Sequence, residues 1–440
     1  MGIFFGTDGI RGKVCGQLNF DLAYKCGNAL GSSLDKPTII IGQDTRISGS
    51  YITLAFAGGA VSAGANVIDI GICPTAGIAY LTKILNADFG VVVSASHNPP
   101  DYNGIKIFDE NGFKLGDARE NALERKFVHT FTISNARIGK YKQKFNLVNF
   151  YIKHLINSCN TTLLGKKVVI DASNGASYKV APEVFKKLGA KVIKISCKND
   201  GNKINCNCGS LHPEILQKKV VLTGADFGFA FDGDSDRIIA CDEQGNIVDG
   251  DQIIFALAKY LKQSNALNKN TVVGTRHTNM GIEKELSRLG INLERSDIGD
   301  KYVLEKMEQM QLNLGGEKSG HIILRDLTTT GDGVLTAVQI AQMCTKMNCT
   351  LSQVTKVELY PQCNIDCPVA DKMRVINSEQ LANAINEEEN LLGKDARIMV
   401  RVSGTEPKIR IMVETNNYNL AEQSAKRLQT MVQKIDNKEV

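Results

Sequence analysis

The sequence has no apolar run that approaches the roughly eighteen residues of a membrane-spanning helix. Its net charge is only +5 at pH 7, which gives no basis for bulk attraction to nucleic acid or to a membrane surface. The segment Met1–Phe5 lacks the pattern of a signal peptide, and Gly6 stands where a myristoylation motif requires Ser or Thr. We therefore expect a cytoplasmic protein that binds neither nucleic acid nor membranes.

The twelve cysteines do not form a disulfide framework, because they are scattered from Cys15 to Cys367 in a chain of 440 residues. Cys206 and Cys208 are the only close pair, and no second pair stands at the spacing that a zinc site requires. We expect reduced thiols, with a metal held by this pair as the minor alternative.

The chain is too long for one hydrophobic core, and its length predicts three or four domains. Three segments repeat a strand, helix and strand pattern without repeating sequence, and a glycine follows each helix as the expected stop. Such units build mixed or parallel sheets covered by helices. The predicted elements lie at 38–42, 51–63 and 66–70, at 167–171, 180–188 and 191–195, and at 271–274, 281–289 and 292–295.

The tail of the chain differs from these repeats. It predicts a strand at 357–360, a helix at 378–388, strands at 396–402 and 408–414, and a helix at 419–436. The fold class is therefore α/β, with three similar mixed-sheet α/β domains plus a smaller C-terminal α+β domain. The expected domains are 1–145, 146–242, 243–357 and 358–440.

The stretch from Phe89 to Phe108 carries the first catalytic candidates. An apolar strand breaks into a rigid loop with two prolines, and the loop contains Ser96 and His97. Lys106 follows on the returning apolar segment. Loops held on a firm scaffold are where catalytic groups usually lie, although a plain polar turn is the alternative for this stretch alone.

Three carboxylates alternate between two apolar segments, at Asp232, Asp234 and Asp236. Their mutual repulsion is relieved by a hard divalent cation, which prefers oxygen ligands. An EF-hand is the rival, but Arg237 stands at its sixth position, where the sharp turn needs glycine, and both flanks are typical of strands. The pattern favours a Mg²⁺ site in a strand-loop-strand unit, completed by water or a phosphate oxygen.

Two further glycine-containing loops carry side chains suited to a sugar phosphate. In 313–322, Glu317 and Ser319 alternate on one side of the chain, as a pair that binds sugar hydroxyls would. In 401–410, two arginines, two hydroxyls and a glycine match a phosphate dianion, which prefers forked donors and backbone N–H groups. A solvated turn and a plain hairpin are the alternatives. Arg11 and Arg46, each beside a predicted turn, are weaker signals.

Five motifs, in order, resemble the α-D-phosphohexomutase superfamily over the full length of the chain. They are FGTDGIRG at 5–12, SASHNPPDYNGIKIF at 94–108, FDGDSDR at 231–237, GGEKSGH at 315–321 and RVSGTEPKIR at 401–410. GGEKSGHII and the stretches 207–217 and 298–307 are similar to the branch that acts on glucosamine phosphates. The resemblance implies four domains around a central cleft, with one active-site loop from each domain.

By the same resemblance, Ser96 would carry the phosphoryl group. Asp232, Asp234 and Asp236 would hold one Mg²⁺ per chain together with an oxygen on Ser96, and Glu317 and Ser319 would bind sugar hydroxyls. The residues near the transferring group would be Arg11, His97, Lys106, Arg237 and His321, and those on the idle phosphate would be Arg401, Ser403, Gly404, Thr405 and Arg410.

The implied reaction interconverts glucosamine 6-phosphate and glucosamine 1-phosphate through a phosphoserine enzyme and a sugar 1,6-bisphosphate, which also serves as activator. Its product would feed the synthesis of UDP-N-acetylglucosamine, a cell wall precursor. Lys318 and the pair Arg276 and His277 depart from the glucosamine branch, so a glucose or mannose phosphate stays open as the substrate. A sugar-phosphate or Ca²⁺ binding protein without catalytic activity is the alternative from another class. The sequence also leaves a homodimer open.

Lys106 or a neighbour is the candidate general acid or base. A lysine base needs a lowered pKa, and we expect nearby cations such as Arg11 or Arg237 to lower it. Closure of the tail domain over the phosphate is a further expectation.

Overall fold

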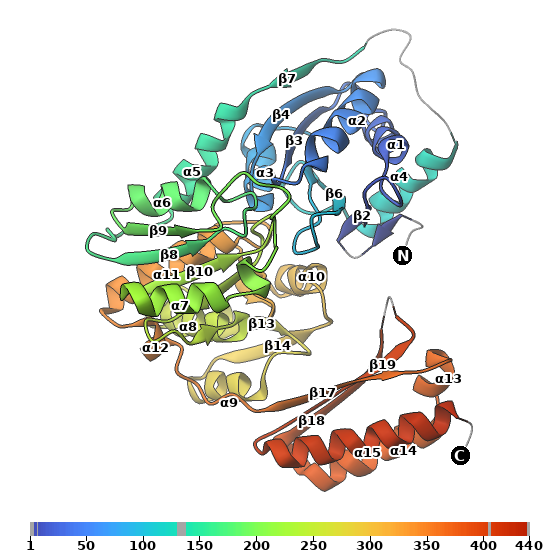
Figure 1. The fold of residues 1–440 in the computed structure, drawn as a ribbon, viewed down its shortest axis with the longest axis vertical. Coiled ribbons are helices and arrows are strands. Elements are labelled where there is room, and N and C mark those ends of the chain that lie inside the picture. The colour runs from blue at the N-terminus through green and yellow to red at the C-terminus, as the bar shows by residue number, and fades with distance from the viewer. Residues whose placement is uncertain (1–3, 7, 130–137, 404–405, 438–440) are drawn as a thin grey trace. The chain divides into compact units, whose positions relative to one another are not determined.

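The protein is described here by a computed structural model, which describes residues 4–6, 8–129, 138–403 and 406–437 (Figure 1). The chain divides into two compact units. The first contains residues 1–278 and 286–356, and the second contains residues 279–285 and 357–440. None of the helices among the described residues combines the length and the apolar composition of a membrane span.

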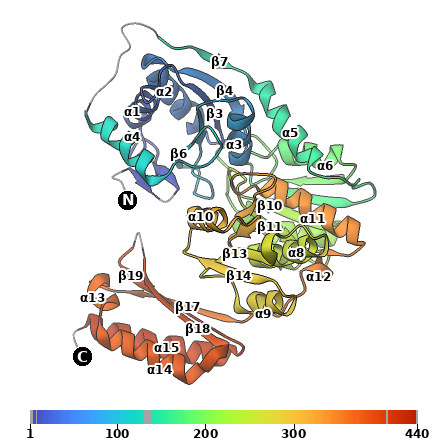
Figure 2. The same cartoon turned by 180° about the vertical axis from the view of Figure 1, so that it is seen from behind.

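The first sheet of the first unit has seven strands, and its centre is parallel because β3 pairs with β4 and β5 in the same direction. Helices α1 and α2 pack side by side (Figure 2), and a Cβ on Gly27 would lie 1.9 Å from the carbonyl oxygen of Phe56. Glycine therefore permits this close helix contact. In spatial order the strands are β1 (Phe5–Gly6), β2 (Gly9–Lys13), β6 (Tyr102–Phe108), β5 (Phe89–Val93), β3 (Thr38–Gln43), β4 (Asn66–Ile72) and β7 (Tyr141–Gln143), and the helices are α1 (Phe20–Gly31), α2 (Ser48–Ser62), α3 (Thr75–Ile84) and α4 (Asp117–His129).

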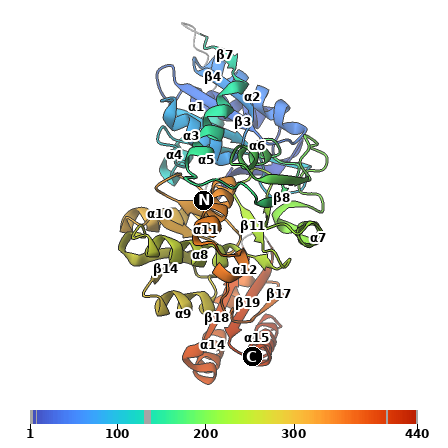
Figure 3. The same cartoon turned by 90° about the vertical axis from the view of Figure 1, so that its left-hand side faces the viewer.

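Two smaller mixed sheets complete the first unit. Helix α5 (Val148–Asn157) contacts both α3 and α6, helices that belong to successive sheets (Figure 3). The five-stranded sheet runs β12 (Ile247–Val248), β11 (Ile238–Cys241), β10 (Phe227–Phe231), β8 (Lys167–Asp171) and β9 (Lys191–Ile195), with α6 (Val180–Lys187) and α7 (Glu214–Thr223). The four-stranded sheet runs β14 (Asn292–Ser296), β13 (Thr271–Thr275), β15 (Leu314–Gly316) and β16 (Ile322–Leu324), and the helices of this part are α8 (Gly250–Gln263), α10 (Asp300–Met310), α11 (Gly333–Met347) and α12 (Leu351–Val354). Helix α9 (Met280–Arg288) begins in the residues that belong to the second unit.

Each of these sheets holds one candidate loop in the same way. The loop leaves the carboxyl end of one strand and returns as that strand's antiparallel neighbour: β5 to β6, β10 to β11, and β15 to β16. We name these the serine loop (residues 94–101), the metal loop (residues 232–237) and the sugar loop (residues 317–321). Paired strands on both sides hold each loop firmly, as a catalytic loop requires.

The second unit has a three-stranded antiparallel sheet, β17 (Gln362–Pro368), β19 (Lys408–Thr415) and β18 (Ala396–Val402), in that order. Helices α14 (Glu379–Leu392) and α15 (Tyr418–Asp436) lie side by side along this sheet (Figure 1), and α13 (Lys372–Ile376) precedes them. The three mixed sheets and this smaller α+β unit confirm the predicted fold class. The four domain boundaries stay a prediction.

One predicted strand was wrong. Residues 357–360 have no regular structure, and the strand lies instead at Gln362–Pro368. The side chain of Asn279 bonds both backbone groups of Tyr360, accepting from its N–H and donating to its carbonyl oxygen, so this segment is not available to a sheet. The true strand buries Cys363 and Cys367, with the half-buried Ile365 between them on the same face, a pattern that Pro361 and the final Pro368 obscure.

Candidate functional site

The metal loop brings its three carboxylates together. Ligand oxygens of Asp232, Asp234 and Asp236 all lie within 4.8 Å of one another, and all three residues are buried. Ser235 adopts a left-handed conformation (φ 62°), which turns the chain between the second and third carboxylates. Strands on both sides of this turn replace the helices that an EF-hand would have.

The serine loop meets the metal loop. Ser96 Oγ donates a hydrogen bond to Asp232 Oδ2 over 2.5 Å, although 136 positions separate the two residues. Ser96 has φ 51°, a left-handed conformation that is uncommon for serine and that directs its side chain out of the strand path. Its N–H donates to Ser94 Oγ at 2.9 Å, and Ser94 Oγ donates to Asp44 Oδ2 at 2.5 Å. The predicted nucleophile is therefore held at the predicted metal site.

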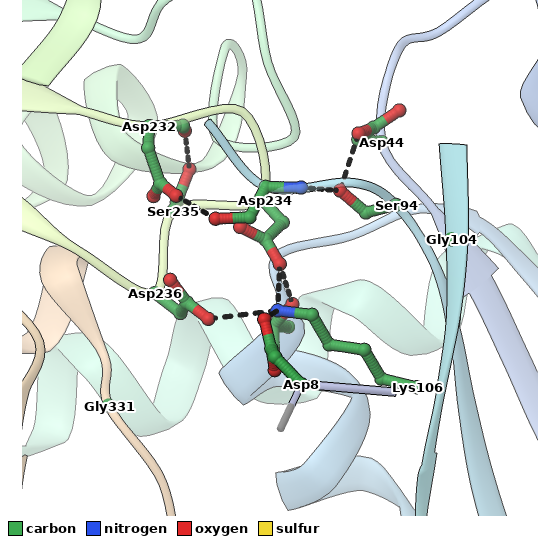
Figure 4. Close-up of polar contacts among 12 residues, drawn as sticks. Asp8, Asp44, Ser94, Gly104, Lys106, Asp232, Asp234, Ser235, Asp236 and Gly331 are labelled. Atoms are coloured by element: carbon green, nitrogen blue, oxygen red, sulfur yellow. Dashed lines mark hydrogen bonds and ion pairs between the residues drawn. The ribbon is translucent and has the colours of Figure 1, made fainter. Parts of the chain in front are cut away.

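Lys106 lies between two carboxylates of the metal loop and that of Asp8, and it is 1% exposed. Its Nζ is 2.8 Å from Asp234 Oδ2 and 3.1 Å from Asp236 Oδ2 and from Asp8 Oδ2 (Figure 4). Burial alone would lower the pKa of this ammonium group, but the three carboxylates raise it well above its usual value. The lowering that the sequence suggested is therefore wrong, and Lys106 is a fixed cation in this arrangement.

The residues of the metal loop fit a divalent cation. Among the described residues, neither Asp234 Oδ1 nor Asp236 Oδ1 accepts a hydrogen bond, and both atoms are buried. His321 Nδ1 lies 3.8 Å and Arg237 Nε lies 3.9 Å from Asp236 Oδ1. Burial and repulsion from the other two carboxylates raise the pKa of Asp232 well above its usual value. A hard cation would satisfy these oxygens and relieve this repulsion.

The two candidate histidines differ in their surroundings. His321 is buried, and its Nε2 accepts from the N–H of Gly331 at 3.0 Å, so its proton resides on Nδ1, which faces Asp236. Burial would lower the pKa of His321, but Asp236 and Asp300 raise it. His97 Nδ1 lies 3.4 Å from Ser96 Oγ, and burial together with Arg237 and Arg11 lowers the pKa of His97 to about 4.

Arg11 and Arg237 border the same cluster. Arg11 donates to Asn98 Oδ1 at 3.1 Å and pairs with Asp8. The backbone N–H of Arg237 donates to Asp232 Oδ1 at 3.1 Å, which fixes the carboxylate whose other oxygen faces Ser96. The Arg11 guanidinium group therefore contacts the serine loop, and that of Arg237 lies beside Asp236, with Nε 3.9 Å from its Oδ1.

The sugar loop presents its predicted pair more openly. Ser319 is exposed, and its Oγ donates to Glu317 Oε2 at 3.4 Å. Glu317 Oε1 accepts from the N–H of Gly299 at 2.9 Å, at the start of α10. The two side chains therefore contact each other, as the alternation in the sequence suggested.

The predicted phosphate-binding residues lie in the second unit. Arg401 and Arg410 are directly opposed on β18 and β19, and burial together with Arg410 lowers the pKa of Arg401. Ser403 is buried, and its Oγ accepts from the N–H of Glu406 at 3.3 Å. Gly404 and Thr405 lie outside the described residues. Like charges placed opposite each other on a sheet are unfavourable, so this pair fits an anion.

Sequence reasoning missed three charged residues of the cluster. Lys114 Nζ is 2.5 Å from Asp8 Oδ1 and also pairs with Asp300, which begins α10. The signal for Asp8 was its place in the glycine-rich turn at 5–12 that carries Arg11. No periodicity indicated Lys114 or Asp300, because their contact joins positions 186 apart.

Family models match four successive parts of the chain. The models described as phosphoglucomutase/phosphomannomutase α/β/α domains I, II and III match residues 2–132, 149–245 and 249–360, and the C-terminal domain matches residues 365–430. The chain belongs to this family. The order of the four models agrees with the repeated sheets and the distinct tail.

Named relatives and solved structures extend this result. The phosphoglucosamine mutase of Carboxydothermus hydrogenoformans is 43% identical, over 99% of this chain and 100% of its own length. A phosphoglucomutase/phosphomannomutase family protein of Burkholderia thailandensis has the same fold, with a TM-score of 0.83 at 23% identity over 97% of both chains. N-acetylphosphoglucosamine mutase of Aspergillus fumigatus, solved with GlcNAc-6P and magnesium, gives a TM-score of 0.69 at 15% identity over 99% of this chain and 96% of its own.

Proposed function

We propose that this member of the family interconverts glucosamine 6-phosphate and glucosamine 1-phosphate, as an isomerase-class phosphotransferase. One observation carries the proposal: the Ser96 hydroxyl is hydrogen-bonded to a carboxylate of a metal-binding loop from another sheet. Relatives named phosphoglucosamine mutase, 41–44% identical over 94–99% of the chain, support glucosamine over glucose or mannose.

The reaction is two phosphoryl transfers in opposite directions. Phospho-Ser96 gives its phosphoryl group to the free hydroxyl of the sugar phosphate: the bond from phosphorus to Ser96 Oγ breaks, a bond to the sugar oxygen forms, and the proton of the sugar hydroxyl passes, in net terms, to Ser96 Oγ. The sugar becomes a 1,6-bisphosphate. The bisphosphate turns end for end, and its other phosphoryl group passes to Ser96. The same bisphosphate would activate an enzyme that lacks the phosphoryl group, because it can phosphorylate Ser96 directly.

The charges around Ser96 suit this transfer. Asp232, Asp234 and Asp236 would hold Mg²⁺ together with an oxygen on Ser96, and the ion would neutralise negative charge on the transferring group. Lys106 donates hydrogen bonds to Asp234 and Asp236, and these carboxylates raise its pKa, which favours the charged ammonium form. Electrostatic stabilisation by such pre-placed groups is usually a large contribution to catalysis.

The remaining predicted residues would bind the sugar and its idle phosphate. Glu317 and Ser319 would bind hydroxyl groups of the sugar. The hydrogen bond from Ser319 to Glu317 would then be replaced by hydrogen bonds to the sugar. The phosphate that is not transferring would bind at Arg401, Ser403, Gly404, Thr405 and Arg410, where two opposed guanidinium groups fit a dianion. We also propose that the protein works in the cytoplasm.

Comparing kcat/KM for glucosamine 1-phosphate, glucose 1-phosphate and mannose 1-phosphate tests the substrate. We expect the highest value for glucosamine 1-phosphate and one added phosphate on Ser96 by intact mass. A higher value for glucose or mannose 1-phosphate would favour the alternative substrate, for which Lys318 and Arg276 are the residues to examine first. Absence of turnover with all three would point to a binding protein.

A further inference from the structure

Two side chains, Arg46 and Asn205, donate hydrogen bonds to the backbone of the serine loop. Arg46, which is 1% exposed, directs its guanidinium group at backbone carbonyl oxygens of this loop. Its Nη2 donates to the carbonyl oxygens of Ser96 at 2.9 Å and Asn98 at 2.8 Å, and its Nη1 donates to that of Tyr102 at 2.9 Å. Its Nε donates to Asp44 Oδ2 at 2.9 Å, which fixes the guanidinium plane.

Asn205 donates to the same two carbonyl oxygens from a different sheet. It lies in the segment that follows β9, and its Nδ2 is 2.8 Å from the oxygen of Ser96 and 3.0 Å from that of Asn98. Both partners can only accept, so the atom facing them must be the amide nitrogen. Each of these carbonyl oxygens therefore accepts two hydrogen bonds, one from Arg46 and one from Asn205.

The surrounding backbone leaves little room for this loop to move. A Cβ on Gly233 would lie 2.5 Å from the carbonyl oxygen of Ser96, and a Cβ on Gly201 would lie 2.2 Å from that of Thr45. The first contact joins the serine loop to the metal loop, and the second joins the backbone beside Arg46 to the segment that carries Asn205. Side chains other than glycine would separate the two sheets where the nucleophile meets the metal loop.

We propose that Asn205 and Arg46 are positioning residues that together hold the serine loop against the metal loop. The inference rests on the proposed function. The hydrogen bonds to the carbonyl oxygen of Ser96 hold this residue in its left-handed conformation. Those to the carbonyl oxygen of Asn98 hold the residue whose side chain binds Arg11. Loss of one donor would let Ser96 Oγ drift from its position 2.5 Å from Asp232. A displacement of about 1 Å at a reacting atom can lower the rate about 100-fold.

The test compares Asn205→Gly with Asn207→Gly. Both asparagines have left-handed backbones, with φ 57° and 50°, so glycine suits each position, and Asn207 is exposed on the same loop. For Asn205→Gly we expect kcat, and the single-turnover rate of Ser96 phosphorylation by glucose 1,6-bisphosphate, to fall about 10- to 100-fold. KM should stay within about threefold, because no substrate contact is removed. Asn207→Gly should match the wild type in all three quantities.

The outcomes separate positioning from folding and from the proposed function. If Asn205→Gly matches Asn207→Gly in kcat, or only lowers the melting temperature, the proposal is wrong. If Asn205→Gly does not fold, Asn205→Asp keeps the shape of the side chain but removes both donor hydrogens, and Asn207→Asp controls for the added charge. If the wild type does not convert glucosamine phosphates, the proposed function fails, while the rate of Ser96 phosphorylation still decides the role of Asn205.

Discussion

The metal loop and the arginine loop, residues 401–410, both gather charges of one sign, but they balance them differently. In the metal loop, Asp232, Asp234 and Asp236 are all buried, and the compensating cation Lys106 is buried with them. A buried charge without its partner costs several kcal/mol, about 3–5 for a broken buried pair. The charges around Ser96 are therefore interdependent, and the structure fixes them before a substrate arrives.

In the arginine loop, the carboxylates that balance the positive charge of Arg410 lie at the surface. Arg410 Nη2 lies 3.4 Å from a carboxylate oxygen of Glu406, and its Nε lies 3.6 Å from one of Asp366. Both acidic side chains are 51% exposed, so water screens these pairs and they contribute little to stability. A phosphate dianion can replace such partners at small cost. Under the proposed function, this difference would suit the first region to chemistry and the second to binding and release of a phosphate.

Replacing the nucleophile should give the largest effect. We expect Ser96→Ala to lower kcat by more than about 10³-fold, because no other hydroxyl on the serine loop contacts Asp232 among the described residues. The same chemical change in the arginine loop, Ser403→Ala, should raise KM and leave kcat near wild type. Steady-state kinetics with intact-mass detection of phosphate checks both variants. Wild-type turnover by Ser96→Ala would remove this serine from the mechanism.

Removal of the metal should have the second-largest effect on turnover. Treatment with EDTA should abolish most turnover, and Mg²⁺ should restore it and raise the melting temperature. Saturation at 100 times the dissociation constant would add about 2.7 kcal/mol of stability. Asp234→Asn should weaken both responses, whereas Arg410→Gln should leave the Mg²⁺-dependent shift in melting temperature intact. Full activity and an unchanged melting temperature after chelation would contradict the metal site.

Two lysines give a direct test of the comparison. Lys106 bonds buried carboxylates, and Lys408 lies 2.7 Å from Asp366 and 2.8 Å from Glu406, both exposed. Lys106→Met should lower the free energy of unfolding by about 3–5 kcal/mol, because it leaves buried carboxylates unpaired. It should also lower kcat about 100-fold. Lys408→Met should melt close to the wild-type temperature. Thermal unfolding and steady-state rates check both, and equal effects of the two substitutions would break the comparison.

Local sequence patterns predicted most of the fold. The strands at Lys167–Asp171, Lys191–Ile195 and Ala396–Val402 have the predicted bounds, because apolar β-branched runs ended by turn residues leave few alternatives. The strand at Gln362–Pro368 was missed, since two cysteines supply its buried side, Pro361 precedes it and Pro368 ends it. A contact between Asn279 and Tyr360 keeps residues 357–360 out of the sheet, and no local sequence pattern reveals this contact.

The site was predictable only where chemistry leaves a local pattern. Three alternating carboxylates indicate a cation wherever the chain folds, so the metal loop could be found from the sequence. The surroundings of Lys106 could not, because Asp8, Asp234 and Asp236 reach it from distant positions. The sequence therefore predicted a lowered pKa for Lys106, whereas the structure raises it. The motifs contain the arginines that would lower this pKa, but they do not show that three carboxylates lie closer to Lys106 and have the larger effect.

The smallest expected effect concerns the opposed arginines. Arg410→Gln should raise KM about tenfold, since one charge-assisted donor to the idle phosphate is lost, while kcat stays within about threefold. The free protein should be no less stable, because the substitution also removes the repulsion with Arg401 that lowers the pKa of that residue. Lys426→Gln is the control, as this lysine pairs only with Glu422 on an exposed face of α15 in the described structure. A fall in kcat comparable to that of Lys106→Met would mean that the arginine loop also takes part in the transfer, and the division between chemistry and binding would fail.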